Sequence, residues 1–190
     1  MLKCSLLFLF LCASLALTGA ALSPAQEVSG GQSQDAISVR LRGIDGKTYD
    51  IAEMRGQVVL VSFGATWCKP CAWELAALEE LKKEYAGRPV KFLWVSIETQ
   101  PDVSDKVLRQ YTEKLRLTIP VLRDPNRATF AQFSDTVRLP VVVFFDANGR
   151  FVAPKHTGMS PQPDEYKNMV RRRVDALLAA RPNSTAAGTD

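Results

Sequence analysis

The chain has 190 residues, 46% of them hydrophobic, which is enough for one ordinary domain with a buried core and short flanking segments. Its formal net charge is only +4, from 24 lysines and arginines against 20 aspartates and glutamates. This balance argues against nucleic acid as a partner, because nucleic-acid binding calls for a strong, clustered positive charge.

The N-terminus has the layout of a secretory signal peptide. Lys3 supplies a positive charge, an almost unbroken apolar run extends from Leu6 to Leu17, and small residues at 18–21 suit a signal peptidase. We therefore expect a signal peptide over residues 1–21, export across the inner membrane to the periplasm, and no stable membrane insertion after cleavage. A spanning helix needs about 20 apolar residues, so the run is short for an anchor, but an uncleaved anchor stays open as the alternative.

Two segments have the composition of unstructured chain. Residues 22–36 are rich in serine, glycine, glutamine and proline, and are expected to form a flexible linker. Residues 181–190 are expected to form a disordered tail. A single folded domain is therefore expected over residues 37–180.

The first expected elements are a strand pair, a buried strand and a helix. Apolar and polar residues alternate over 37–41, and Asp45-Gly46 marks a hairpin turn. The continuous apolar run Val58–Phe63 predicts a strand buried on both faces. The pattern from Cys71 to about Tyr85 is helical, and Gly87 ends it.

Further along, a second buried strand is expected at Val90–Ile97. Ser104 can cap a helix that runs to about Lys114, and a short helix is expected over Arg127–Phe133. A third buried strand is expected at Val141–Phe145. Asn148-Gly149 then turns the chain towards residues 151–152.

Pro163 opens a last expected helix, which ends near Ala180. Buried strands therefore alternate with helices along most of the chain. This alternation predicts an α/β fold in which helices flank a central sheet.

Cysteine use points to chemistry more than to a disulfide scaffold. Cys4 and Cys12 lie inside the expected signal peptide, so the mature chain keeps only Cys68 and Cys71. A pair this close in sequence closes almost no loop and contributes little stability, although an inert disulfide stays open as an alternative. A zinc site needs two more ligands, and the mature chain offers only His156, so we expect neither a metal nor another cofactor.

Cys68 and Cys71 lie where a buried strand gives way to a helix. A helix N-terminus presents unpaired N–H groups and the positive end of the helix dipole, and both stabilise a thiolate. We expect Cys68 to be the exposed attacking sulfur and Cys71, one turn into the helix, the shielded resolving sulfur. Pro70 suits a helix start, and Lys69 between the cysteines should favour a thiolate.

The segment Trp67-Cys68-Lys69-Pro70-Cys71, together with Leu139-Pro140 before a buried strand, resembles the thioredoxin superfamily and more closely its exported TlpA/ResA-like branch. The resemblance covers about residues 37–180 and implies a thioredoxin-like fold with a central mixed β-sheet. It implies a cis peptide bond before Pro140 and a place for that proline facing the cysteines. It also implies a partner-binding surface, formed by Trp67, Lys69, Pro70, Leu139 and Pro140.

Glu74 is the third expected catalytic residue. It lies three positions after Cys71, on or beside an apolar helical stripe, where a carboxylate is costly unless it has a partner or a role. A raised pKa would let it exchange protons with Cys71, and TlpA/ResA-like proteins have a functional glutamate at this spacing. The alternative is a partly exposed helix carboxylate. Ser62 stands where ordinary thioredoxins carry a buried aspartate, which would leave proton handling to Glu74.

Two further aromatic side chains are interpreted as structural. Trp73 is expected to take part in ordinary helix packing. His156 is expected to be a surface or turn histidine and not a ligand of the kind found in copper chaperones of the same fold, which use a wider cysteine spacing.

The resemblance implies dithiol–disulfide exchange with the thiols and disulfides of other proteins. It suggests a reductant, acting on apocytochrome c cysteines before haem attachment and supplied with electrons by a membrane-bound donor. An oxidant or isomerase stays open, since the direction depends on a reduction potential that no sequence pattern reveals. A thiol peroxidase and a non-catalytic metal carrier stay open as well.

Overall fold

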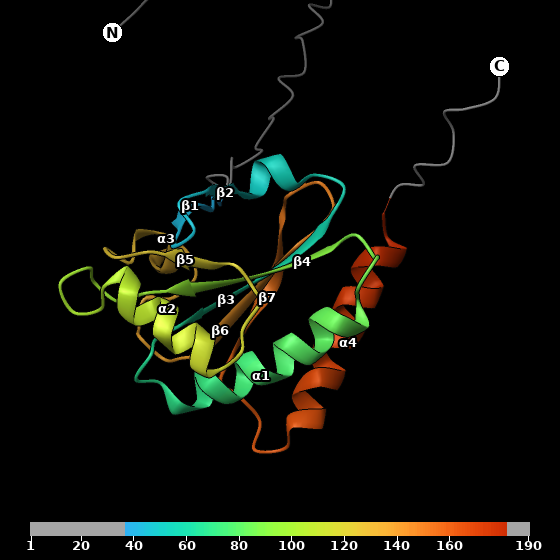
Figure 1. Ribbon diagram of the computed structural model, residues 1–190. Helices are drawn as coiled ribbons and strands as arrows, with labels where there is room; N and C mark the ends of the chain where they lie inside the picture. Colours follow the sequence, from blue (N-terminus) through green and yellow to red (C-terminus); the bar gives the residue numbers. More distant parts are fainter. Residues whose placement is uncertain (1–36, 182–190) are drawn as a thin grey trace, which may run out of the picture. The chain divides into compact units, whose positions relative to one another are not determined.

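A seven-stranded sheet with helices on both faces forms the centre of the chain in a computed structural model, which describes residues 37–181 (Figure 1). The expected signal peptide (1–21), the expected linker (22–36) and the expected tail beyond Arg181 lie outside the described residues. Within residues 37–181, no helix is both long enough and apolar enough to cross a bilayer.

The sheet is mixed, and its strands stand in the order β2-β1-β5-β4-β3-β6-β7. The β3–β4 and β4–β5 pairs are parallel, whereas the other neighbouring strands are antiparallel. The strands are β1 (Arg40–Gly43), β2 (Thr48–Asp50), β3 (Val58–Gly64), β4 (Val90–Ser96), β5 (Val121–Arg123), β6 (Val141–Phe145) and β7 (Phe151–Thr157). Every residue of β3 is buried, which explains its unbroken apolar sequence.

The helices cover the two faces of the sheet unequally. They are the 3₁₀ helix η1 (Ile51–Met54) and the α-helices α1 (Lys69–Glu84), α2 (Asp105–Lys114), α3 (Ala128–Ala131) and α4 (Pro163–Ala179). Buried side chains of α1, α2 and α4 share one core cluster with one face of the sheet, and those of η1 and α3 share a second cluster with the other face. Ser104 caps α2 as expected, because its side chain accepts a hydrogen bond from the backbone N–H of Val107.

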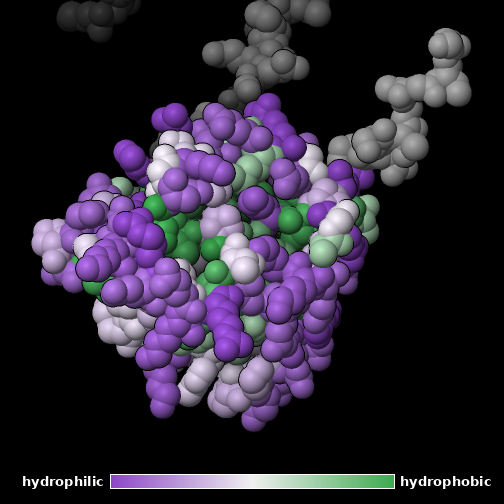
Figure 2. All heavy atoms as spheres, in the orientation of Figure 1, coloured by the Kyte–Doolittle hydropathy of each residue, from purple (hydrophilic) through white to green (hydrophobic). Residues whose placement is uncertain are grey.

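Apolar side chains are visible mainly over the strands. In the space-filling view, hydrophobic side chains gather across the middle of this face, and hydrophilic side chains surround them (Figure 2). On this face the hydrophilic side chains therefore lie largely over the helices and loops around the strands.

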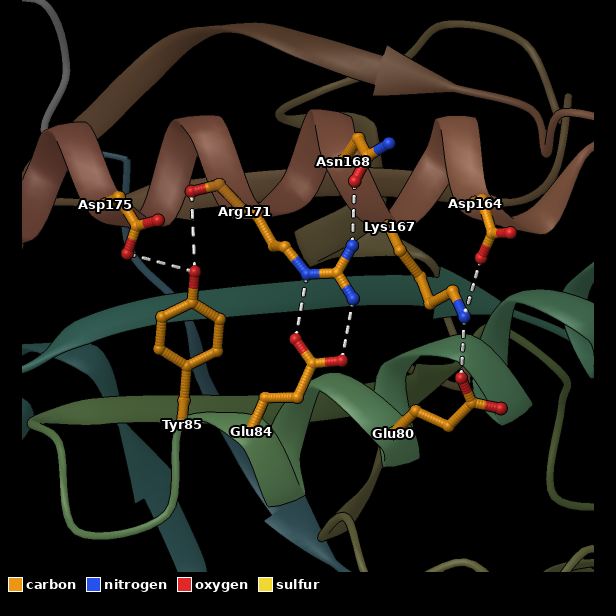
Figure 3. Close-up of polar contacts among 8 residues, drawn as sticks. All are labelled: Glu80, Glu84, Tyr85, Asp164, Lys167, Asn168, Arg171 and Asp175. Atoms are coloured by element: carbon orange, nitrogen blue, oxygen red, sulfur yellow. Dashed lines mark hydrogen bonds and ion pairs between the residues drawn. The ribbon is translucent and has the colours of Figure 1, made fainter.

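Polar contacts join α4 to α1 along their outer sides (Figure 3). Arg171 donates two hydrogen bonds to the carboxylate of Glu84, at 2.8 and 2.7 Å. Lys167 donates to Glu80 at 2.8 Å, and Tyr85 donates to Asp175 at 3.1 Å. Exposed ion pairs stabilise a fold only weakly, so these contacts act mainly by setting how α4 lies against α1.

The structure confirms the α/β fold with a central mixed sheet, and it adds three details to the expected elements. β5 and η1 were not predicted. The final strand, expected at residues 151–152, runs on to Thr157. The first long helix begins at Lys69, two positions before the expected start at Cys71.

Candidate functional site

Cys68 and Cys71 form a disulfide at the N-terminus of α1, with their Cα atoms 5.2 Å apart. β3 ends at Gly64, and a short loop carries the chain to Cys68, which is the N-cap of the helix. The sulfur of Cys68 accepts a hydrogen bond from the backbone N–H of Cys71 at 3.2 Å. Pro70 lies in the first turn, where its missing N–H would have no helical partner. The local sequence therefore places one sulfur at the positive end of a sixteen-residue helix.

Both cysteines are buried in the disulfide form. Cys71 is 0% exposed and Cys68 is 5% exposed, so Cys71 is the more shielded of the two, as expected. The expectation that the sulfur of Cys68 is exposed is wrong for this state. The reason is packing, because Ala65 and the partly buried Leu139 enclose the cysteine pair.

The Leu139-Pro140 segment lies beside the cysteines, and the peptide bond between these two residues is cis, as the resemblance implied. Leu139 packs against the cysteine pair, while Pro140 is buried. The carbonyl of Pro140 accepts a hydrogen bond from the N–H of Gly158 at 2.8 Å, which ties the start of β6 to the end of β7.

Two tryptophans are exposed near the cysteine pair. Trp67 is 66% exposed, and Trp73 is 52% exposed. The interpretation of Trp73 as ordinary helix packing is therefore wrong. Residues two apart on a helix point to nearly opposite sides, so a buried Cys71 turns Trp73 outwards. The ammonium of Lys69 lies 5.4 Å from the centre of the Trp73 ring, a cation–π distance.

The carboxyl group of Glu74 is fully buried beneath α1. Ser62 donates a hydrogen bond to Oε2 at 2.5 Å, and Tyr166 donates to Oε1 at 2.7 Å. Burial raises the pKa of Glu74 to about 7, and the two hydroxyl bonds offset part of that effect. The alternative of a partly exposed carboxylate is therefore excluded. A carboxyl with this pKa can hold or release a proton near neutral pH.

Tyr166, from α4, is a site residue that the sequence did not reveal. It lies on a buried stripe of α4 with Val170 and Val174, where its ring packs in the core. A tyrosine on such a stripe needs a partner for its hydroxyl, which is the signal that could have drawn attention to it. Burial and the nearby carboxylate raise the pKa of Tyr166 well above its ordinary value, so its hydroxyl stays protonated and remains a donor.

His156 lies in a strand, next to Tyr166, and not in a turn. It belongs to β7, opposite Val142, and its ring centre is 5.8 Å from that of Tyr166. Burial lowers its pKa. Among residues 37–181, no group of three histidine, cysteine, aspartate or glutamate side chains is placed to hold a metal ion.

Glu98 holds the loop that leads to Cys68. Its buried carboxylate accepts hydrogen bonds from the backbone N–H and the hydroxyl of Thr66, at 2.9 and 2.7 Å. Ser96 donates to the same carboxylate at 3.1 Å. Glu98 was not among the expected site residues, although a charged residue directly after a buried strand was the available signal. Glu98 therefore holds in place the loop that precedes Cys68. None of these hydrogen bonds involves a cysteine sulfur.

Gly64 allows the end of β3 to approach α1 closely. A Cβ atom at this position would lie 2.6 Å from Nε1 of Trp94 and 3.3 Å from the sulfur of Cys71. The first distance is shorter than real Cβ contacts, so a side chain cannot be added without moving a neighbour. The cysteine pair, Trp94 and the strand end therefore meet only because residue 64 is glycine.

Comparison with known proteins agrees with this geometry. A family model described as the AhpC/TSA family matches residues 33–153. The thioredoxin-like protein YneN of Bacillus subtilis is 36% identical over 100 residues, which cover 52% of this chain and 57% of YneN. The thiol-disulfide oxidoreductase ResA of Oceanobacillus iheyensis is 29% identical over 109 residues, covering 56% of this chain and 53% of that protein. The match thus spans about half the length of these two relatives.

A solved structure shares the fold. The crystal structure of a thioredoxin-family thiol:disulfide interchange protein from Chlorobium tepidum superposes with a TM-score of 0.61. It is 23% identical in sequence, and the superposition covers 75% of this chain and 94% of that one. At this identity the likeness establishes a shared thioredoxin-like fold.

Proposed function

Because this chain belongs to the AhpC/TSA family, we propose that it is a thiol–disulfide oxidoreductase that exchanges its Cys68–Cys71 pair with the thiols and disulfides of other proteins. The observation that carries the proposal is the disulfide at the N-terminus of α1, one helical turn from a buried carboxyl group with a pKa of about 7. A disulfide that served only for stability would require neither the helix terminus nor the carboxyl group.

Cys68 is the proposed nucleophile in the reduced enzyme. Its thiolate attacks one sulfur of a substrate disulfide, the substrate S–S bond breaks, and the departing substrate sulfur takes up a proton. The helix dipole and the N–H of Cys71, 3.2 Å from the sulfur of Cys68, stabilise the thiolate. Such surroundings lower a cysteine pKa from about 8.5 towards the range of about 3.5–7.5.

Cys71 is the proposed resolving residue. It loses its proton, attacks the sulfur of Cys68 and expels the second substrate sulfur as a thiolate. The products are the Cys68–Cys71 disulfide and a substrate dithiol, so two electrons have passed to the substrate. The reverse sequence oxidises a substrate dithiol.

Glu74 is the proposed proton acceptor for Cys71. The two residues lie one turn apart on α1, so their side chains share a helix face. With a pKa of about 7, the carboxyl group is ionised in a useful fraction of molecules near neutral pH and can take up the proton. The hydroxyls of Ser62 and Tyr166 hold its two oxygens, and this keeps the group in one orientation.

The proposed partner surface surrounds the cysteine pair. Trp67 offers a large exposed aromatic face, and the partly buried Leu139 packs against the cysteines. Lys69 and Pro70 complete this surface in the proposal, and the buried Pro140 contributes by positioning Leu139, its neighbour in the cis peptide bond. A substrate segment lying against Leu139 would bring its sulfur to Cys68.

We place the protein in the periplasm as a reductant, on the basis of the expected signal peptide over residues 1–21 and the similarity to ResA. The proposed substrates are protein disulfides, including those of apocytochrome c, and a membrane-bound donor would return the reduced state. An oxidant would use the same residues in the opposite direction, and the reduction potential distinguishes the two.

A redox titration tests the proposal. The purified chain is equilibrated with mixtures of reduced and oxidised glutathione, free thiols are alkylated, and the labelled cysteines are counted by mass spectrometry. We expect Cys68 and Cys71 to become labelled together in one two-electron transition. A midpoint of about −270 mV supports a reductant, and one of about −120 mV supports an oxidant.

The same preparation should accelerate the reduction of insulin by dithiothreitol. A disulfide that stays intact even in excess dithiothreitol, or an insulin reaction that proceeds no faster than without protein, would contradict the proposal. Peroxide consumption in the absence of insulin reduction would favour the thiol peroxidase alternative instead.

A further inference from the structure

The indole nitrogen of Trp94 is a buried hydrogen-bond donor that has no acceptor among residues 37–181. Trp94 is 0% exposed, and its ring stacks on Tyr111 with 5.6 Å between ring centres. Buried donors without acceptors are unfavourable and rare in folded proteins. An acceptor that formed beside this donor would therefore be stabilised by it.

The sulfur of Cys71 is next to this donor. A Cβ atom on Gly64 would lie 2.6 Å from Nε1 of Trp94 and 3.3 Å from the sulfur of Cys71. Both atoms thus lie against the position that a side chain of residue 64 would occupy. Their separation cannot exceed the sum of these two distances, so only a few ångströms can lie between the donor and the sulfur.

The sheet register places this pair on the same face as the buried carboxyl group. Ser62, which donates to Glu74, pairs with Trp94 across the parallel β3–β4 ladder. Gly64 lies two residues further along β3, on the same side. The side chain of Cys71 therefore lies near two groups, the unpaired indole N–H of Trp94 and the carboxyl group of Glu74, which is one helical turn away.

We propose that Trp94 donates a hydrogen bond from Nε1 to the sulfur of Cys71 when the disulfide is reduced. A disulfide sulfur is a weak acceptor, whereas a thiolate is a strong one. Reduction thus creates an acceptor beside a donor that lacks one. The inference rests on the proposed function to the extent that the Cys68–Cys71 bond must be reducible.

This bond would oppose the effect of Glu74. An ionised Glu74 disfavours a second negative charge on Cys71, and its effect disappears when it is protonated. The indole N–H is neutral and does not titrate, so it stabilises the Cys71 thiolate at every pH. Trp94 thereby helps Cys71 to ionise above neutral pH, where Glu74 is negatively charged.

Other titratable groups lie on the elements around the pair and have to be considered in the test. They come from five parts of the chain and are Cys68 at the N-cap of α1 with Glu74 inside that helix, Tyr166 of α4, His156 of β7, Tyr111 of α2, and Glu98 beyond β4. Glu74 is the group whose titration could imitate that of Cys71. The variant Glu74→Gln removes this ambiguity.

Nuclear magnetic resonance of the indole N–H groups tests the proposal without any substitution. The chain has three tryptophans, and the exposed Trp67 and Trp73 serve as internal references. In the isotope-labelled full chain, reduction with dithiothreitol should move the Trp94 signal downfield and slow its exchange with deuterated water. On raising the pH, the signal should follow the ionisation of Cys71, in Glu74→Gln as well, but not in Cys71→Ser.

Trp94→Phe removes the donor and should reduce the fraction of Cys71 thiolate at a given pH by about tenfold, as measured by alkylation rate. Tyr111→Phe is the matched control, because it removes a hydroxyl from the stacked ring and leaves the indole N–H in place. If both thiols become free on reduction while the Trp94 signal stays where it was, the inference is overturned and the proposed function stands. A disulfide that resists reduction overturns both.

Discussion

The phenol oxygen of Tyr166 lies 2.7 Å from a carboxylate oxygen of Glu74, although the two residues are 92 positions apart in the chain. The bond connects α4 to α1 through the core, and Ser62 supplies the second donor from β3. Both partners are hydroxyl groups, so neither adds a positive charge to offset the burial of the carboxylate. The site therefore keeps its acid close to the midpoint of its titration at neutral pH.

Glu74→Gln should change how stability depends on pH. The folded-state pKa of about 7 lies above the ordinary value of 4.5 expected in the unfolded chain. Between these pH values the unfolded chain releases a proton that the folded chain retains, so stability that is fully present below about pH 4.5 is lost as the pH rises towards 7. Removing the carboxyl group should abolish this loss, which amounts to about 3 kcal/mol above neutral pH.

Urea unfolding of the oxidised chain and of Glu74→Gln, at a series of pH values, measures this effect. The difference between the two free energies of unfolding isolates Glu74 from the surface carboxylates, which both proteins share. A difference that stays constant from acid to neutral pH would show that the carboxyl group titrates normally.

The same variant should alter the rate at which a mixed disulfide is resolved. In the native chain, the rate should show an inflection near the pKa of Glu74, at about 7, because the ionised carboxylate accepts the proton of Cys71. Glu74→Gln should lose this inflection. Rapid acid quenching at successive times, followed by separation of mixed disulfides, provides the measurement.

Glu79→Gln is a suitable control for that experiment. Glu79 lies on the same helix, but its carboxylate accepts hydrogen bonds from the backbone N–H groups of Thr118 and Ile119. Its loss should lower stability and leave the pH profile unchanged. Equal changes in the two profiles would assign the effect to helix packing.

Tyr166→Phe should raise the pKa of Glu74 further. The hydroxyl of Tyr166 donates to the carboxylate and favours its charged form, so its removal favours the protonated form. The loss of a hydrogen bond to the buried carboxylate should also lower stability at high pH by about 1–3 kcal/mol. The side-chain carboxyl signal of Glu74 in nuclear magnetic resonance reports the pKa directly, and an unchanged titration would remove Tyr166 from the site.

Single substitutions of the cysteines should separate their roles. Cys68→Ser should abolish exchange, since the thiolate at the helix N-terminus is lost. Cys71→Ser should still attack but should accumulate mixed disulfides, because no second sulfur can release the substrate. Non-reducing electrophoresis with a protein disulfide substrate distinguishes the two, and full activity of Cys68→Ser would assign the nucleophile elsewhere.

Gly64→Ala should destabilise the chain. The added methyl group would lie 2.6 Å from Nε1 of Trp94, so either the indole or α1 has to move. Overpacking of this kind lowers stability by about 1–3 kcal/mol. Thermal unfolding measures the loss, and an unchanged melting temperature would mean that the end of β3 and the indole of Trp94 are not in close contact.

Most of the fold could be predicted because its signals are local. Runs such as Val58–Phe63 and Val141–Phe145 are long, wholly or almost wholly apolar and bounded by turns, so their strand character is plain in the sequence. β5 covers only Val121–Arg123, between Pro120 and Asp124. It is a strand because β1 and β4 lie on either side of it, and that pairing is not encoded within three residues.

The residues of the site also divide into those that the sequence could predict and those that it could not. Cys68, Cys71 and Glu74 lie within a single helical segment, so their spacing alone brought them together. Tyr166 comes from another helix and Trp94 from a neighbouring strand, and their contacts depend on how these elements pack. Non-local pairs of this type carry no periodic signal.

Tyr166 follows Glu74 by 92 positions in the chain, and this separation has a consequence for biosynthesis. Polypeptides emerge from the ribosome N-terminal end first, so both cysteines and Glu74 leave the exit tunnel well before α4 has been made. A nascent chain at that stage carries its two thiols without the acid environment that tunes them in the finished domain. Full redox competence is therefore acquired only after α4 has been synthesised.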